Sequence, residues 1–385
     1  MSAKKVPLRS VCAQDRASVR PGERGDLTYL GLEGIEADTG QFVGGDLSKT
    51  PETPQANSFL FDSRHVLYGK LRPYLNKVAV PEAQGKCSTE IVPLLPAREL
   101  NRQYLAYYLR SPSTVAQITD RSAGARMPRA DMDFVLSLEI PLLHLDEQRR
   151  IVDILSRAEG IVRLRREAQR KAAELIPAIF IDMFGDPVTN PKGWPVSPLG
   201  EVLAAADYGS STKASPTNTG LPIIRMGNVT TAGDLDLNEL KYVELSDADI
   251  ERFRLRKGDL LFNRTNSKEL VGKTGLWDGS LDAVAASYFI RLRARLDTAH
   301  PTYLWAWMNS RHMKRIHFDT ARGAIGQANI NSKELKAFAV AVPPLDLQEA
   351  FDGRVQDIRS ICGQQADSLC RAIAAFEGLL SRTFH

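Results

Sequence analysis

The sequence has few cysteines and no long apolar run, and each shortage excludes a class of protein. Its four cysteines, Cys12, Cys87, Cys362 and Cys370, form no C-x-x-C pair in a chain of 385 residues, so neither a disulfide framework nor a zinc ribbon is indicated. No apolar run approaches the roughly 18 residues of a membrane span, and the N-terminus MSAKKVPLRS lacks the apolar core of a secretion signal. We therefore expect a protein of the reducing cytoplasm without a membrane segment.

Sequence motifs for catalysis are missing as well. The six histidines show no metal-ligand spacing, and no serine or cysteine nucleophile motif occurs. Asn190-Pro191-Lys192 lacks the second proline and the aromatic residue of an adenine methyltransferase loop. Gly272-Lys273-Thr274 resembles the end of a phosphate-binding loop, but Ser267 stands where that loop needs a glycine. The sequence thus predicts no catalytic site, metal or cofactor.

Length and composition predict an ordinary globular protein with two folded units. A chain of 385 residues is long for one domain, and 43% hydrophobic with 25% charged residues is typical of soluble proteins. The net charge is only +4, yet the chain holds 34 arginines against 16 lysines. The planar guanidinium group suits phosphates and guanine edges, although a GC-rich coding sequence also favours arginine.

The chain repeats itself at nearly constant offsets, which indicates a duplicated unit. The matched pairs are VLYGKLRP from Val66 with LLFNRTNS from Leu260, 194 residues apart, YLAYYLRS from Tyr104 with YLWAWMNS from Tyr303, 199 apart, and LDEQ from Leu145 with LDLQ from Leu345, 200 apart. An ordered series of this kind predicts two copies of one fold. Each copy is expected to contain short strands, two helices, a glycine-containing loop and a closing strand.

Each Leu-Asp-x-Gln motif opens a stretch with the spacing of a long helix. Asp146 and Asp346 are candidate caps for helices that we expect at residues 146–185 and 346–385. Steps of three and four residues predict a coiled-coil seam. Its members are Ile151, Ile154, Ala158, Ile161, Arg165, Ala168, Ala172, Leu175 and Ile179 in the first helix, and Val355, Ile358, Cys362, Ala366, Leu369, Ile373, Phe376 and Leu380 in the second. Pro177 should kink the first helix or end it near Ile176, and Gly185 should terminate it.

A lone helix of about 40 residues with an apolar stripe would be unstable in water, so the two helices are expected to pack on each other. The sequence therefore predicts an α+β fold class. Two similar globular domains, residues 1–145 and 186–345, would be separated by a pair of long antiparallel coiled-coil helices and related by a pseudo-two-fold axis. Packing between helices explains the apolar seam positions and leaves charged outer faces for a partner.

Basic residues cluster at matching places in the two domains. The first domain carries a net charge of +2 and the second +3, while the helices carry +1 and −2. The clusters are Arg64, Lys70, Arg72, Lys77, Arg110, Arg121, Arg126 and Arg129 in the first domain, and Arg252, Arg254, Arg256, Lys257, Arg264, Lys273, Arg311, Lys314, Arg315 and Arg322 in the second. One cluster alone is more often a solvated face. Recurrence in both copies favours a surface that grips the phosphates of a DNA duplex.

Together these features resemble the specificity subunit of type I restriction-modification systems, over essentially the whole chain. The resemblance rests on the duplicated plan, the helix entries LLHLDEQ and VPPLDLQ, and the motifs LYGKLRPYLNK from Leu67, GAIGQANINSKEL from Gly323 and MFGDP from Met183. Two positions depart from the family pattern: Leu347 replaces the usual glutamate of the second entry, and GARMPR from Gly124 is less typical than its counterpart.

The resemblance implies a non-catalytic DNA reader that needs no cofactor. Each domain would recognise one half of a split, asymmetric site in double-stranded DNA, and the helical pair would space the domains and dock two modification subunits. Restriction subunits would join them, so that the assembled complex would be an adenine-specific DNA methyltransferase and an ATP-dependent endonuclease.

Eleven polar residues in matched loops are our candidates for DNA binding. They are Lys70, Arg72, Lys77, Arg126, Arg129, Asn263, Arg264, Lys273, Arg322, Gln327 and Asn329. The basic ones are expected to hold phosphates rather than read bases, since half to two-thirds of protein–DNA hydrogen bonds go to the backbone. Asn263 and Gln327 are candidates for base readout. For each of the eleven residues, a structural role in bracing the loops is an equally good interpretation.

Three other interpretations stay open at the level of sequence. A stand-alone two-domain DNA-binding regulator would bind a specific site tightly without any methyltransferase partner. A partner-bridging scaffold would show weak, salt-insensitive DNA affinity. An enzyme would need a catalytic constellation, and the sequence offers none.

Overall fold

The computed structural model describes residues 4–43, 56–122, 124, 126–322 and 328–384. The chain divides into two compact units, which we call unit 1 (Met1–Glu167 with Ala366–His385) and unit 2 (Ala168–Gln365). Both units mix strands and helices, as the predicted α+β class requires. Helices α4 (Leu145–Phe184) and α9 (Leu345–Phe384) each contribute residues to both units, so the predicted domain boundaries at 145/146 and 345/346 stay a prediction.

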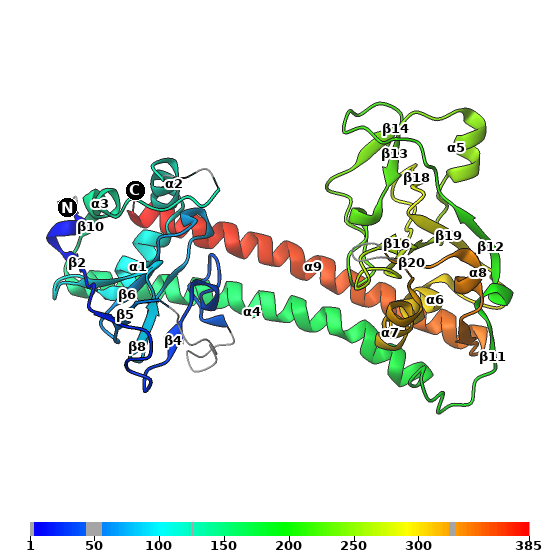
Figure 1. Ribbon diagram of the computed structural model, residues 1–385, viewed down its shortest axis with the longest axis horizontal. Helices are drawn as coiled ribbons and strands as arrows, with labels where there is room; N and C mark the ends of the chain where they lie inside the picture. Colours follow the sequence, from blue (N-terminus) through cyan, green and yellow to red (C-terminus); the bar gives the residue numbers. More distant parts are fainter. Residues whose placement is uncertain (1–3, 44–55, 123, 125, 323–327, 385) are drawn as a thin grey trace. The chain divides into compact units, whose positions relative to one another are not determined.

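Unit 1 is built from short strands, three short helices and parts of the two long ones (Figure 1). Its strands are β1 Lys4–Pro7, β2 Cys12–Gln14, β3 Ser18–Val19, β4 Tyr29–Leu30, β5 Ser58–Phe61, β6 Val66–Gly69, β7 Val78–Ala79, β8 Gly85–Ser88, β9 Ile91–Pro96 and β10 Glu139–Leu142. Its short helices are α1 Arg102–Arg110, α2 Pro112–Asp120 and α3 Met132–Ser137. Pro112 occupies the first turn of α2, where its missing N–H costs no helical hydrogen bond.

Unit 2 follows the same plan with additional strands. Its strands are β11 Val196–Pro198, β12 Leu203–Tyr208, β13 Leu221–Ile224, β14 Lys241–Val243, β15 Leu260–Asn263, β16 Thr265–Asn266, β17 Thr274–Leu276, β18 Val284–Ala285, β19 Phe289–Ala294, β20 Ala328–Asn329 and β21 Ala339–Ala341. Its short helices are α5 Asp247–Phe253, α6 Pro301–Met308, α7 Arg311–Thr320 and α8 Ser332–Lys336.

The two units share sheet order and strand register. The central sheet runs β2-β9-β6-β7 in unit 1 and β12-β19-β15-β17 in unit 2. Val66 pairs with Leu94 in the first sheet, and Leu260 pairs with Leu292 in the second. A parallel pair recurs as well, β4 with β8 and β13 with β18, although most neighbouring strands are antiparallel. Because register fixes which side chains face the core, this agreement confirms the duplicated plan.

Each unit closes its core with the end of one long helix. In unit 1 the Tyr104 ring lies 5.0 Å from the Phe384 ring of α9, and the Tyr104 hydroxyl donates to the Pro141 carbonyl at 3.0 Å. In unit 2 Tyr303 lies 4.8 Å from Phe184 of α4. Its hydroxyl donates to Ala341 at 2.6 Å. The start of α4 therefore packs with the end of α9, and the end of α4 with the start of α9, which is an antiparallel pairing.

The Leu-Asp-x-Gln motif is explained by its glutamine, which is fully buried in both units. Gln148 Oε1 accepts from the Asn101 N–H at 2.8 Å, and its Nε2 donates to the carbonyls of Glu99 and Leu143, both at 2.8 Å. Gln348 makes the corresponding three bonds, to His300, Thr298 and Pro343. One amide side chain therefore satisfies three buried backbone groups where the helix leaves its domain.

Asp146 and Asp346, the predicted caps, lie inside the helices and not at their cap positions. α4 begins at Leu145 and α9 at Leu345, with the first backbone bonds accepted by His144 and Pro344. Asp146 and Asp346 therefore sit in the first turn, where a carboxylate still interacts favourably with the helix dipole. α4 also continues through Pro177 to Phe184. Gly185 ends it with a φ of +84° and donates its N–H to Ile181, as predicted.

The seam of the second helix is as predicted. That of the first is confirmed at Ala172, which is buried, and at Ile151, Ala158 and Ile179, which pack against the cores, but it is displaced by one residue at three other positions. Val355, Ile358, Phe376 and Leu380 are buried in α9. In the middle of α4, between residues 153 and 175, Leu155 and Val162 are buried beside Ala172, whereas the predicted Ile154, Ile161 and Leu175 are 44%, 53% and 43% exposed. At adjacent apolar pairs such as Ile154-Leu155 the sequence does not decide which residue belongs to the seam. In the structure the second member of the pair contacts the domain core.

All four cysteines are free thiols, two of them buried. Within the described ranges, no helix is both long enough and apolar enough to cross a membrane.

Candidate nucleic-acid interface

The candidate residues of unit 1 gather where two loops meet. The loop after β6 lies against residues 126–130, because Arg72 N–H donates to Pro128 at 2.7 Å and Ala130 N–H donates to Lys70 at 2.8 Å. Leu71 and Arg129 form an isolated bridge between the same segments. Lys70, Arg72, Arg126 and Arg129 therefore belong to one surface, which we call loop surface 1.

Loop surface 1 presents cations beside apolar side chains. Arg72 and Arg126 are exposed. Tyr74 and Met127, which follow them in the same two loops, are 50% and 47% exposed. Arg72 has a φ of +52°, so a left-handed turn at a non-glycine residue fixes the direction of this loop. Exposed cations with a neighbouring aromatic ring suit a nucleic-acid backbone and its bases.

Arg129 differs from its neighbours because it already has an anionic partner. Its Nη2 lies 3.0 Å from Glu90, and this hydrogen bond raises the pKa of the Arg129 guanidinium. The pair lowers the net positive charge that this part of the loop offers to a phosphate.

Unit 2 builds an equivalent surface, which we call loop surface 2. β16 pairs with β20, and Ile330 N–H donates to the Arg264 carbonyl at 3.0 Å. This bond corresponds to the bond from the Ala130 N–H to the Lys70 carbonyl in unit 1, because Lys70 and Arg264 each directly follow the equivalent strands β6 and β15. Arg264, Arg322 and Asn329 are thereby brought together, and Arg322 is 85% exposed with its Nε 3.5 Å from Glu334. Gln327 lies outside the described residues.

Aromatic residues of loop surface 2 were missed at the level of sequence. The Arg264 guanidinium stacks 4.8 Å above the Tyr208 ring, and Tyr208 is 44% exposed. Tyr288 is 42% exposed, and its carbonyl accepts the Arg264 N–H. Lys268 Nζ lies 4.3 Å from the centre of the Phe318 ring. The sequence signal that could have found them is a tyrosine next to a strand: Tyr208 is the last residue of β12, and Tyr288 directly precedes β19.

Three other candidates lie below the surface. Lys77 Nζ donates to Leu32 at 2.8 Å and Lys273 Nζ donates to Val229 at 2.6 Å, and burial lowers the pKa of both lysines. Each ammonium group therefore braces a loop. Asn263 is fully buried, and neither atom of its amide has a partner among the described residues. Base readout by Asn263 stays a prediction.

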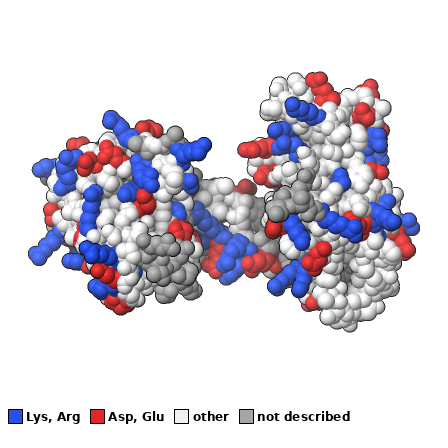
Figure 2. All heavy atoms as spheres, in the orientation of Figure 1, with Lys and Arg blue, Asp and Glu red and all other residues white. Residues whose placement is uncertain are grey.

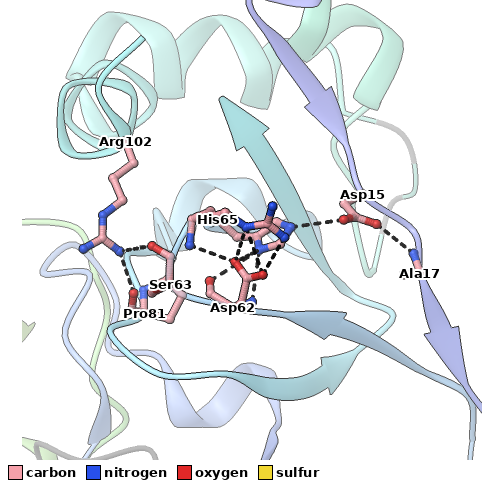
Figure 3. Close-up of polar contacts among 8 residues, drawn as sticks. Asp15, Ala17, Asp62, Ser63, His65, Pro81 and Arg102 are labelled. Atoms are coloured by element: carbon pink, nitrogen blue, oxygen red, sulfur yellow. Dashed lines mark hydrogen bonds and ion pairs between the residues drawn. The ribbon is translucent and has the colours of Figure 1, made fainter. Parts of the chain in front are cut away.

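A buried histidine offered the best alternative site for chemistry (Figure 3). His65 Nε2 lies 3.3 Å from Asp15 and Nδ1 lies 3.1 Å from Asp62, while Arg64 also pairs with Asp62 at 2.7 Å. Hydrogen bonding from Arg64 lowers the pKa of Asp62 to about 2. The ring is 2% exposed, so this cluster ties strand segments together. In the part of the chain that the structure describes, no group of three or more His, Cys, Asp or Glu side chains has a geometry that could hold a metal ion.

Figure 2 shows basic side chains interspersed with acidic ones over each unit on the face drawn. The face drawn therefore shows no extended patch of one sign. Several cations on the two loop surfaces stand beside exposed aromatic or apolar groups, although Arg129 and Arg322 also have carboxylate partners.

Comparison with known proteins identifies the family of this duplicated fold. The profile described as "Type I restriction modification DNA specificity domain" matches residues 43–173 and 191–351. The chain belongs to this family.

Relatives in the family are about a quarter identical to the chain over the aligned residues. It is 27% identical over 196 residues to the putative type I restriction enzyme MjaX specificity subunit of Methanocaldococcus jannaschii, covering 50% of this chain and 46% of that protein. It is 24% identical over 310 residues to the type I restriction enzyme EcoKI specificity subunit of Escherichia coli K12, covering 76% and 66%. The matches thus span about half to two-thirds of the length of these relatives.

Solved structures agree in fold. A structure described as showing complex assembly and conformational transition of the type I R-M system has a TM-score of 0.63 at 22% identity, covering 100% of this chain and 98% of that one. The type I restriction-modification S subunit from M. genitalium has a TM-score of 0.53 at 13% identity, covering 99% and 96%.

Proposed function

We propose that this chain is the DNA-recognition subunit of a type I restriction-modification complex, and that each unit reads one half of a bipartite, asymmetric target in double-stranded DNA. The single observation that carries the proposal is the recurrence of one loop surface, in the same strand register, in both units of a chain that belongs to the specificity family. A protein that held only one such surface would read one continuous site.

Within each loop surface we assign different tasks to the side chains. Arg72, Arg126 and Arg322 are exposed and contact phosphates, since exposed guanidinium groups bind them in bidentate fashion. Lys70 and Arg264 occupy equivalent strand-end positions and approach the base edges. Lys77 and Lys273 hold the loops in place. Asn329 supports its loop through backbone pairing with Thr265.

The long helices have two tasks in this proposal: they set the distance between the half-sites, and they dock two modification subunits. Ile154, Ile161 and Leu164 give the first part of α4 an outer stripe that is 44%, 53% and 62% exposed. An apolar stripe of this length on a helix marks a contact surface for a partner. The modification subunits would supply adenine methylation, and restriction subunits would supply ATP-driven cleavage.

Removal of phosphate contacts tests the DNA-reading proposal. We expect the Arg72→Ala/Arg126→Ala variant to bind target DNA more weakly and with a salt dependence reduced by about 2, since each lost phosphate contact lowers the slope of log K against log salt by about 0.9. Fluorescence anisotropy with a target duplex over a series of salt concentrations measures both.

The matched control is Lys4→Ala/Lys5→Ala, which removes the same charge from exposed positions on β1. Equal losses in the two double variants would refute the assignment of loop surface 1. A chain that assembles with its modification subunits but binds all duplexes with one affinity would refute the proposed function itself.

A further inference from the structure

Unit 2 contains an apolar pocket that neither loop surface uses. It has a volume of about 670 Å³ and lies between the second part of α4, helices α6 and α7, and α9. Trp305 forms its floor and is 4% exposed, with its indole N–H donated to Gly233 at 2.9 Å. Ile176 and Phe180 line one wall. Ile181, at the mouth, is 47% exposed.

In unit 1 the part of this place beside α9 is filled by side chains, and a smaller pocket of about 480 Å³ remains beside α4, lined by Ala106, Tyr107, Arg110 and Glu159. Tyr104 and Tyr303 make the same contacts 199 residues apart, and Gln148 and Gln348 make theirs 200 apart, so equivalent positions can be matched in α1 with α6 and in the long helices. Four residues that line the pocket of unit 2 have larger counterparts in unit 1: Ala306 corresponds to Tyr107, Asn309 to Arg110, Ile176 to Phe376, and Ala173 to Ile373. The unit 2 residue is smaller in each of these four pairs, although other lining residues such as Trp305 and Phe180 are larger than their counterparts Ala106 and Leu380.

The residues that fill unit 1 contact one another directly. The Tyr107 and Phe376 rings lie 6.2 Å apart with an edge-on angle of 73°. The Tyr107 hydroxyl donates to Glu159 at 2.9 Å, and the Arg110 guanidinium pairs with the same carboxylate at 2.6 Å. The Tyr107 and Phe376 rings therefore fill the part beside α9 in unit 1, and the Arg110–Glu159 pair lines the smaller pocket that remains. The equivalent side chains of unit 2 are smaller, so the pocket is open there, even though Trp305 stands where unit 1 has the smaller Ala106.

The rim of the pocket in unit 2 is positively charged. Arg359 stands where unit 1 has Glu159, and its guanidinium stacks 4.6 Å above the Trp305 ring. Arg311 and Lys314 line the opposite side, against one carboxylate, Asp234. Lys314 is held by the Thr231 carbonyl at 2.9 Å. An apolar floor under three cations and one anion is complementary to an apolar group flanked by carboxylates.

We propose that this pocket docks an acidic segment of a partner polypeptide, which inserts an aromatic side chain over Trp305 and places carboxylates beside Arg311 and Arg359. The aromatic group takes the space that Tyr107 and Phe376 occupy in unit 1, and its acidic neighbours supply the charge that Glu159 supplies there. The inference is independent of DNA reading, because no residue of loop surface 1 or 2 lines the pocket.

Rebuilding the plug of unit 1 inside unit 2 tests this inference. The variant Ile176→Phe/Ala306→Tyr/Asn309→Arg/Arg359→Glu places the four unit 1 residues at their equivalent positions. The probe is a fluorescein-labelled acidic amphipathic peptide, AEELFEELFEELA, followed by fluorescence anisotropy with the full chain. We expect saturable binding to the unmodified chain and at least a tenfold weaker Kd with the plugged variant. Replacement of both Phe residues of the peptide by Ala should weaken binding by a similar factor.

Two controls separate pocket binding from misfolding and from general charge attraction. Arg359→Glu alone keeps the pocket open, and we expect it to weaken the acidic peptide and to strengthen a peptide with Lys in place of Glu. Ala374→Tyr adds a ring at an exposed site on α9 outside the pocket, and it should leave the Kd unchanged. Thermal unfolding followed by circular dichroism checks that each variant is folded.

Several results would overturn the inference. Equal affinity of the plugged and unmodified chains, or binding that ignores the loss of Phe from the peptide, would show that the pocket is not used. Binding of the apolar dye ANS without binding of the peptide would make the occupant a small molecule. A concentration-dependent dimer in sedimentation that the plug abolishes would make the occupant a second copy of this chain.

Discussion

His317 lies fully buried in unit 2, and neither ring nitrogen has a partner among the described residues. Its ring packs 5.2 Å from Phe262 and 5.5 Å from Phe338. A Cβ on Gly272 would come within 2.2 Å of His317 Nδ1, so this loop needs glycine both for space and for its φ of +88°. Burial, reinforced by the nearby charge of Lys314, lowers the pKa of His317 to about 3. A histidine here is held neutral at a cost in stability.

We predict that His317→Ile stabilises unit 2 and removes part of its acid sensitivity. The equivalent residue of unit 1 is Ile118, which is 1% exposed, so the fold already accommodates this side chain. Because the folded pKa lies below the unfolded value near 6.5, stability from the neutral ring is full above pH 6.5 and falls as the pH drops toward 3. Between pH 7.5 and 5 the original chain should lose about 2 kcal/mol more than the variant. Urea unfolding at both pH values measures this, and parallel losses would contradict it.

Lysines that brace loops should behave differently from arginines that face solvent. Lys77→Met keeps the apolar stem but removes the bond to the Leu32 carbonyl, so we expect a loss of about 1–3 kcal/mol in stability. The salt dependence of DNA binding should stay unchanged, in contrast to Arg72→Ala. Urea unfolding combined with DNA titrations over salt separates the two effects. A normal unfolding midpoint with a reduced salt slope would instead make Lys77 a phosphate ligand.

At the scale of elements, each long helix is anchored at its start by a glutamine and at its end by a phenylalanine. Gln148 ties α4 to the backbone just after β10 and just before α1, and Phe184 packs against Tyr303. α9 has the same two anchors in Gln348 and Phe384. Helices attached in this way do not depend on intrinsic helix propensity, because packing of one face supplies most of their stability.

Gln148→Ala should destabilise unit 1 by about 2–4 kcal/mol, because it strands one N–H and two carbonyl groups in a buried position. Gln348→Ala should do the same to unit 2, and Gln117→Ala serves as the control because that side chain is exposed and makes one weak bond at 3.3 Å. Hydrogen exchange resolved by residue would locate each loss. A uniform loss over the whole chain would contradict the assignment to one helix start.

At the scale of the whole molecule, the proposed ruler function of the helices can be tested by changing their length. Insertion of seven residues after Arg170 in α4 and after Gly363 in α9 keeps the seam in phase, since the packing repeats every seven residues. Each helix gains about 10 Å at ~1.5 Å per residue. We expect the spacer between the half-sites to lengthen by about 3 bp, at 3.4 Å per bp, while both half-sites stay the same.

Methylome sequencing of cells that carry the lengthened chain with its modification subunits measures half-sites and spacer together. The control is a conservative exchange in the same region, such as Arg170→Lys, which should leave the recognised site unaltered. Changed half-sites with a constant spacer would refute the ruler hypothesis.

The sequence by itself determined the duplication, the positions of the long helices and the family. Repeats in order at offsets near 194 to 200 fix a shared topology, since equal spacing of strands and helices permits the same register twice. Motifs such as LDEQ and LDLQ marked the helix starts to within one residue because local chemistry governs a helix terminus.

Only the tertiary structure decided the rest. The phase of the seam in α4 depended on which member of pairs such as Ile154-Leu155 meets the domain core, and a single helix repeat does not distinguish them. Whether a lysine braces or projects depended on a carbonyl distant in sequence, such as Leu32 for Lys77. The stack of Arg264 on Tyr208 and the pocket above Trp305 also join segments far apart in the chain. Such contacts are set by packing in three dimensions, which residue order alone does not encode in a readable way.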